Sequence, residues 1–150
     1  MAQSLAKIIL HIVFSTKNRS KLILDEFEPE LHSYLAKVCH NLGCYVYRVG
    51  GTQNHIHIAC TLPRAISAAD LLENLKTGSS RWMKTKSPRC SNFAWQNGYA
   101  AFSLGQSQLD KIVKYIGCQK EHHRTCGFKE EVMELLRKYE IEFNEKYLWD

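Results

Sequence analysis

Apolar residues recur along this chain with two different periods, and these periods predict the order of its strands and helices. Residues 7–16 form a mostly apolar run dense in β-branched side chains, which is typical of a central strand. Over residues 25–42 the apolar positions repeat every three or four residues, which is the spacing of a helix with one buried face. Pro29 suits the first turn of that helix, and we expect Gly43 to end it.

The middle of the chain predicts a hairpin followed by a long helix. Strands are expected over residues 44–49 and 55–61, with the two glycines at 50–51 turning the chain between them. A Ser-x-x-Asp pattern then forms a capping box, which predicts a second helix over residues 67–86.

The last third of the chain is predicted to form one more strand and two more helices. An Asn-Gly turn precedes a strand over residues 99–104, after which Gly105 breaks the chain. A second Ser-x-x-Asp pattern opens a helix over residues 107–122, and a fourth helix is expected over residues 130–139. The order β-α-β-β-α-β followed by helices predicts an α+β, ferredoxin-like (RRM-like) split β-α-β fold, in which helices cover one face of an antiparallel sheet.

The composition narrows the class of protein without naming it. With 150 residues and no repeat or linker, we expect a single domain with one core. No apolar run is long enough to cross a bilayer and no secretory signal is present, so we expect a cytoplasmic protein. The six cysteines include no C-x-x-C pair and are expected to be reduced, small apolar residues. The net charge of +5 allows a phosphate-rich partner without demanding one.

A His-x-His pattern in the predicted strand at 55–61 gives the first sign of chemistry. Side chains alternate along a strand, so His55 and His57 face one side while Ile56 and Ile58 face the other. Two imidazoles about 6–7 Å apart on one face can share a divalent cation. The alternative for the pair alone is two polar residues on the exposed face of a half-buried strand.

The predicted helix over residues 107–122 contains a tyrosine that is a candidate nucleophile. Tyr115 and Gln119 are four residues apart, so they lie on one side of the helix, at the flank of its apolar stripe. A phenol, whose pKa is about 10, can attack a phosphodiester when a cation polarises the phosphate. The amide oxygen of Gln119 can supply a third metal ligand and leave positions open for the substrate. The alternative is an ordinary tyrosine at the edge of the core and a solvated glutamine.

Together, the two motifs resemble those of the single-tyrosine HUH transposases of small bacterial insertion sequences, which act on single-stranded DNA. The similarity covers nearly the whole chain. It includes the segments HIVFSTKNR, GGTQNHIHIAC, WQNGYAAFSLG and YIGCQKEHH and the ending YEIEFNEKYLWD.

This resemblance implies an enzyme: a DNA transposase whose single catalytic domain spans the chain. Tyr115 would be the nucleophile that forms a covalent 5′-phosphotyrosine link and frees a 3′-hydroxyl, while His55, His57 and Gln119 would hold Mg²⁺ or Mn²⁺. The implied substrate is single-stranded DNA. The enzyme would excise an insertion sequence with hairpin ends from one strand and insert it into another. The family also implies a homodimer whose subunits share their active sites, with Gly105 either a hinge for that exchange or a turn residue.

Basic residues in two segments are candidate DNA contacts. At 100° per residue, the second predicted helix separates an apolar arc from a basic arc, which can lie against phosphates or be an ordinary solvated face. The candidates are Lys17 and Arg19 after the first strand, and Lys76, Arg81, Lys84 and Lys86 in or just after the second helix.

Two other classes compete with this interpretation. Another HUH endonuclease, of the replication-initiator or relaxase type, uses the same parts, although relaxases usually have a larger domain and a third histidine. A non-catalytic, ferredoxin-like RNA-binding module has the same fold, but such modules place aromatic residues on the central strands. Histidine-triad hydrolases and two-histidine phosphodiesterases are excluded, because Ala59 occupies a position where they need a polar residue.

Overall fold

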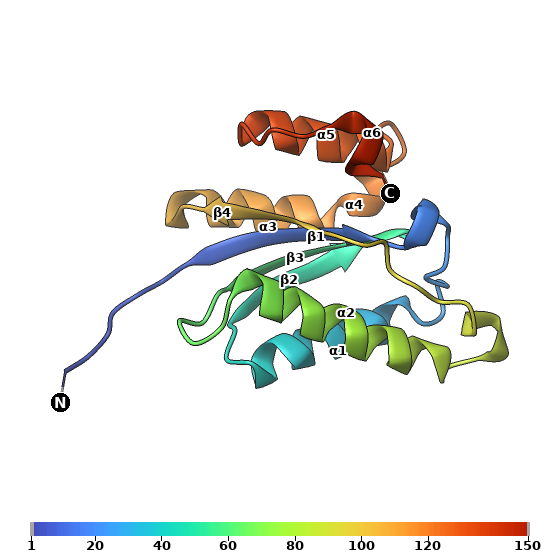
Figure 1. Cartoon of the computed structure of the whole chain (residues 1–150), viewed down its shortest axis with the longest axis horizontal. Coiled ribbons are helices and arrows are strands. Elements are labelled where there is room, and N and C mark those ends of the chain that lie inside the picture. The colour runs from blue at the N-terminus through green and yellow to red at the C-terminus, as the bar shows by residue number, and fades with distance from the viewer. Residues whose placement is uncertain (1, 150) are drawn as a thin grey trace.

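The computed structural model describes residues 2–149, and its centre is a four-stranded antiparallel sheet in the order β2-β3-β1-β4 (Figure 1). The strands are β1 (Ile9–Ser15), β2 (Val46–Gly51), β3 (His55–Thr61) and β4 (Ala100–Leu104). The central strands β1 and β3 pair along their whole length, from Ile9 opposite Thr61 to Ser15 opposite His55. The predicted ferredoxin-like order is confirmed.

Helices cover both faces of this sheet. They are α1 (Glu28–Asn41), α2 (Ala68–Lys84), α3 (Leu109–Gly117), α4 (Gln119–His122), α5 (Phe128–Lys138) and α6 (Glu145–Leu148). Helices α1 and α2 lie on one face, as the split β-α-β order predicts, and the C-terminal helices lie on the other (Figure 1). Among the described residues, no helix is long and apolar enough to span a bilayer.

The main core lies between the sheet and the α1–α2 layer. Alternate residues of the central strands point into it, including the fully buried Ile12, Ile56 and Ile58. Burial of each such side chain contributes roughly 1.5–3 kcal/mol. A smaller cluster on the other face joins Val13 of β1 to Val132 of α5. The sheet is therefore fixed from one side, and its other face is free to carry polar groups.

The structure corrects two details of the sequence prediction. Gly50 and Gly51 do not turn the chain: both belong to β2, and the turn follows them. The helix predicted over residues 107–122 is interrupted at Cys118, whose backbone is not helical (φ −106°, ψ 21°), so that α3 and α4 are separate. Ser107 does not cap this helix; the side-chain oxygen of Gln108 instead accepts the N–H of Gly105 at 2.8 Å.

Close packing of α3 on β2 explains two of the glycines. A side chain at Gly50 would collide with the backbone carbonyl of Ile116, and a Cβ on Gly117 would lie 2.6 Å from the Arg48 guanidinium. Periodicity cannot reveal this requirement, because it depends on a helix that arrives from far along the chain.

We expect Gly50→Ala to destabilise the protein by about 1–3 kcal/mol, because the added methyl group overpacks the contact with α3. Urea unfolding followed by circular dichroism measures this. Gly105→Ala is the matched control: Gly105 has an ordinary backbone conformation (φ −79°), and a Cβ there would lie 3.6 Å from Gln108 Oε1, an ordinary contact, so its effect should stay within about 1 kcal/mol. Equal effects at the two positions would contradict the packing argument.

Candidate metal and tyrosine site

The two histidines of β3 lie side by side on the face of the sheet that carries the C-terminal helices. His55 and His57 are both fully buried, and their ring centroids are 5.1 Å apart. Ile56 and Ile58 point into the core on the opposite face, as predicted. The alternative of a solvent-exposed histidine pair is therefore wrong.

Tyr115 and Gln119 come to the same place from α3 and α4. Gln119 is buried, and its side-chain oxygen Oε1 lies 2.8 Å from His55 Nε2. The Tyr115 ring packs edge-on against His57, with centroids 5.8 Å apart. One chain thus brings together the four residues singled out from the sequence.

A fifth residue, Glu131 of α5, sits at the centre of this group and was missed in the sequence. Its Oε1 lies 2.9 Å from His57 Nε2, and its Oε2 accepts hydrogen bonds from the Tyr115 hydroxyl and from Gln119 Nε2. Glu131 is 1% exposed. Glu131 lies on the buried, apolar face of α5, beside Val132. Because a carboxylate is rare on such a face, this position could have indicated a functional residue from the sequence.

Two consecutive histidines at the end of α4 and just after it complete the shell around Glu131. His122 Nε2 lies 3.3 Å from Glu131 Oε2, and His123 Nε2 lies 3.3 Å from Glu131 Oε1. His123 Nε2 is also 3.0 Å from Gln119 Oε1. The side chains of His55, His57 and Glu131 each offer one ligand atom within 4.8 Å of the others, which is a metal-binding arrangement.

The family model described as "Transposase IS200 like" matches residues 4–119 of the chain. The chain belongs to this family. It is a DNA transposase of the single-tyrosine HUH class, and this assignment excludes the RNA-binding alternative.

Two solved structures have the same fold as this chain. A candidate transposase from Deinococcus radiodurans R1 superposes with a TM-score of 0.61 at 20% identity, over 79% of this chain and 98% of its own. A REP-associated tyrosine transposase bound to a REP hairpin gives a TM-score of 0.61 at 17% identity, over 82% of this chain and 73% of its own. At these identities the likeness concerns the fold alone. Comparison with curated protein sequences gives no match.

Hydrogen bonds around His55 show that the transposase site suits a cation. The amide of Asn54 donates to the carbonyl of Arg19 at 3.2 Å, which directs Asn54 Oδ1 at His55 Nδ1, 2.8 Å away. The amide of Gln119 donates to Glu131 at 3.1 Å, which directs Gln119 Oε1 at His55 Nε2. Each ring nitrogen therefore faces an amide oxygen, which can only accept. His55 Nδ1 also lies 3.0 Å from the Thr52 hydroxyl, which donates to Asn54 Oδ1.

A neutral imidazole has one N–H and cannot satisfy both oxygens. Burial, followed by the neighbouring His57, lowers the pKa of His55 to about 3, so the ring stays neutral at physiological pH. With its proton on Nδ1, His55 turns the lone pair of Nε2 towards Gln119 Oε1. His55 Nε2 and Gln119 Oε1 would both serve as ligands of a metal ion bound there, which would relieve the repulsion between the two acceptors. The donor set of two imidazoles, an amide and a carboxylate can hold a divalent cation.

His11 of β1 supports the second histidine ligand. Its Nε2 lies 2.8 Å from His57 Nδ1, and burial lowers the pKa of His11 to about 3. In this structure His57 Nε2 faces Glu131 Oε1; were a metal ion bound, His57 would carry its proton on Nδ1 and donate it to neutral His11, which would free Nε2 as the ligand atom. Within residues 2–149, the Nδ1 of His11 has no hydrogen-bond partner, so the ring is held in this orientation through Nε2. Such contacts fix the tautomer and orientation of a ligand.

Glu131 and Tyr115 have opposite protonation states. Burial alone would raise the pKa of Glu131, but hydrogen bonds from His123 and His57 hold it well below its usual range. Burial and the adjacent carboxylate raise the pKa of the Tyr115 hydroxyl far above its ordinary value. The phenol is thus protonated at neutral pH and donates to an ionised carboxylate.

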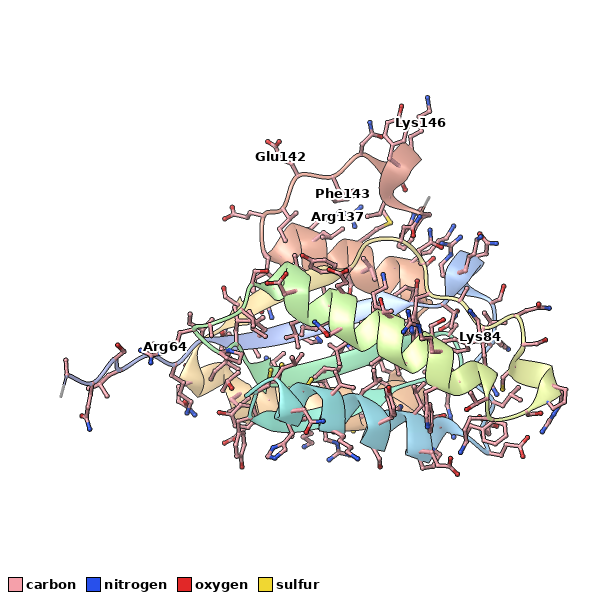
Figure 2. All side chains as sticks on the ribbon, turned by 60° about the horizontal axis from the view of Figure 1, so that its bottom comes forward. Arg64, Lys84, Arg137, Glu142, Phe143 and Lys146 are labelled. Carbon is pink, nitrogen blue, oxygen red and sulfur yellow. The ribbon has the colours of Figure 1, made fainter. Side chains whose placement is uncertain are left out.

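The predicted DNA contacts lie in two different places. Lys17 and Arg19 are on the same side as the site, and Arg19 stacks over Trp149 at 5.2 Å. Lys84, labelled in Figure 2, lies on α2, on the opposite face of the sheet, as do Lys76 and Arg81.

Two of the basic residues in or beside α2 have intramolecular partners. Lys76 donates to the carbonyls of Gln96 and Gly98 at 2.6 and 2.7 Å. Lys86 pairs with Glu30 and lies over Trp82. Lys76 and Lys86 must give up or share these contacts to bind phosphate.

We expect His11→Leu to weaken Mn²⁺ binding by about 10- to 100-fold, because His57 loses the group that fixes its tautomer. Isothermal titration calorimetry measures the affinity. The control is His32→Leu, which alters a histidine of α1 on the opposite face of the sheet and should leave the affinity unchanged. An unchanged affinity in His11→Leu would show that His57 needs no such support.

Without metal, the protein should lose stability as the pH falls below 6.5. The pKa values of His11 and His55 are lowered from 6.5 to about 3, so the unfolded chain gains protons first. Each histidine then costs on the order of 2 kcal/mol between pH 7.5 and pH 5. Urea unfolding at both pH values in EDTA checks this, and His11→Leu should remove about half of the loss. The same pH dependence in that variant would rule out a neutral, buried His11.

Proposed function

We propose that this transposase cuts and rejoins single-stranded DNA through a covalent 5′-phosphotyrosine bond on Tyr115. The observation that carries this proposal is the hydrogen bond from the Tyr115 hydroxyl to Glu131, at the edge of a site that suits a cation. His55, His57 and Gln119 hold Mg²⁺ or Mn²⁺. When bound, the ion polarises the scissile phosphate and stabilises the charge that develops on it.

Glu131 is the proposed proton acceptor. It is ionised and already accepts the hydrogen bond of the phenol. Its lowered pKa makes it a weak base, so the proton moves only as the phenolic oxygen bonds to phosphorus and the phenol becomes acidic. The new phosphorus–oxygen bond links Tyr115 to the 5′ end of the downstream strand. The bond to the upstream 3′ oxygen breaks, and this oxygen takes up a proton to become a free 3′-hydroxyl. Rejoining reverses these steps, so the phosphodiester energy is conserved and no nucleotide cofactor is needed.

The two carboxylate oxygens of Glu131 contact different residues. Oε2 faces Tyr115, whereas Oε1 faces His57 and lies 3.7 Å from His55. Glu131 can therefore contribute to the metal site through Oε1 while Oε2 serves the nucleophile. We propose that Gln119 and Glu131 both approach the ion, which adds one ligand to the set expected from the sequence.

Cavities on two sides of the site give the strand a path. One of about 350 Å³ is lined by Tyr115, His122 and Lys111, and another of about 450 Å³ is lined by His123, Lys120 and Lys21. Lysines at both openings favour a polyanion. We propose that single-stranded DNA crosses the site between these cavities.

The hairpin ends of an insertion sequence are the proposed substrate, as expected for a cytoplasmic transposase that meets DNA as a single strand. The REP-associated relative was solved with a REP hairpin, which supports this choice. Lys17 and Arg19 are the proposed contacts to the strand near the site. Lys76, Arg81, Lys84 and Lys86 are proposed to hold the part of the hairpin that reaches round to α2.

We also propose a homodimer. Since Tyr115 reaches Glu131 and His57 of its own chain, each subunit can assemble a site in cis. A shared site requires α3 to leave β2, where Gly50 and Gly117 allow close packing. Gly105 is the proposed pivot of that movement.

The covalent adduct tests the central step. Single-stranded oligonucleotides that carry the subterminal palindromes of the element are incubated with protein and Mg²⁺ or Mn²⁺ and separated on a denaturing gel. A 3′-end label should move into a protein adduct, and a 5′-end label should appear as a shorter free strand. Tyr115→Phe should abolish both products, whereas Tyr34→Phe, on α1 at the opposite face, should retain them. An adduct in Tyr115→Phe, or one that carries the 5′ label, would refute the proposal.

Glu131→Gln keeps the shape of the side chain and removes its basicity. We expect the rate of adduct formation to fall by about 10²- to 10⁴-fold, with binding of the same oligonucleotide retained. Single-turnover kinetics and fluorescence anisotropy measure the two quantities. Glu130→Gln, on the same helix but outside the cavities beside Tyr115 and His123, is the matched control and should react at the normal rate. A normal rate in Glu131→Gln would remove this carboxylate from the mechanism.

A further inference from the structure

Three of the six cysteines meet on the face of the sheet opposite the tyrosine site. Cys39 lies in the last turn of α1, Cys44 in the connection to β2, and Cys60 near the end of β3. Their sulfur atoms lie within 4.8 Å of one another. All three residues are buried, and the most accessible, Cys44, is 4% exposed.

The backbone, rather than the sulfur atoms, brings these residues together. The N–H of Cys44 donates to the carbonyl of Cys39 at 2.9 Å, across the turn that ends α1 at Gly43 (φ +93°). Cys60 is paired with Val46 in the register of β2 and β3. The cluster is therefore set by a helix end and a strand pairing, so its geometry is in place before any ligand arrives. No C-x-x-C spacing marks it in the sequence.

The surroundings leave the three thiols with few polar partners except one another. All three belong to the large apolar cluster between the sheet and α1–α2. The negative end of the α1 dipole lies beside Cys39, and it favours a cation at this point.

We propose that Cys39, Cys44 and Cys60 bind one soft dication of the zinc class, which ties α1 to β2 and β3. Soft thiolate ligands select such ions, whereas the tyrosine site offers only nitrogen and oxygen. On binding, two or three thiols release their protons to solvent, and the resulting thiolates balance the charge of the dication. The two faces of β3 thus carry sites for two kinds of metal ion. His57 belongs to the site with nitrogen and oxygen ligands, and Cys60, three residues later, belongs to the thiolate site on the opposite face.

Cadmium titration of the full chain tests this site apart from the catalytic one. The titrated protein carries the substitutions His55→Ala and His57→Ala, so that the tyrosine site no longer competes for Cd²⁺. It is purified with a reductant and a chelator. Bonds between Cd²⁺ and thiolate sulfur absorb in the ultraviolet. We expect one equivalent of Cd²⁺ to bind with this absorption, to raise the melting temperature and to be displaced by Zn²⁺ only in large excess, because thiolate sulfur prefers the softer Cd²⁺.

Single cysteine variants identify the ligands. Cys44→Ala and Cys60→Ala should each abolish both the absorption and the stoichiometric binding. Cys90→Ala is the matched control, because Cys90 is buried in the same core but lies outside the sulfur cluster, and it should retain both. If Cys60→Ala does not fold, Cys44→Ala and the protection of wild-type thiols from alkylation by Cd²⁺ decide the question.

Three results would overturn the proposal. The first is a folded protein that binds no Cd²⁺ with thiolate absorption. The second is undiminished binding in the cluster variants, which would assign the ion to the more accessible Cys118 and Cys126. The third is a disulfide between two of Cys39, Cys44 and Cys60, found by peptide mapping of protein purified without reductant, because that bond would then occupy the cluster.

Discussion

One buried carboxylate, that of Glu131, organises the face of the molecule on which the proposed chemistry takes place. An ionised carboxylate removed from water is costly unless charged or hydrogen-bonding groups surround it. His57, His123, Gln119 and the Tyr115 hydroxyl supply these groups. Because they come from β3, from α3 and from the segment around α4, the carboxylate holds these elements to α5 at one point. A cation in the same place relieves the remaining conflict between acceptors.

The sheet makes this arrangement possible by being anchored from its other side. The apolar residues of β1 and β3 that face α1 and α2 supply most of the burial, which frees their opposite faces for His11, His55 and His57. Helix α3 then approaches β2 closely where glycines leave room, and the break at Cys118 allows Gln119 to begin a new helical turn above His55. Packing on one face thus determines the position of polar groups on the other.

Periodicity predicted the parts of this structure that depend on local sequence. The strand order, the orientation of the two histidines and the capping box of α2 followed from alternation and spacing. The resemblance then led to the family. The role of Gly50 and the break at Cys118 could not be predicted, because both depend on how α3 meets a distant strand. Glu131 was missed for the same reason: its partners are 8 to 74 residues away in the chain.

A crystal structure of the transposase grown with Mn²⁺, located by its anomalous signal, tests the central claim most directly. The account predicts one ion at about 2.1 Å from the Nε2 atoms of both His55 and His57, with an oxygen of Gln119 or Glu131 as a further ligand and the Tyr115 hydroxyl facing the open side. An ion bound elsewhere, or imidazole rings turned so that their Nδ1 atoms face the metal, would contradict it.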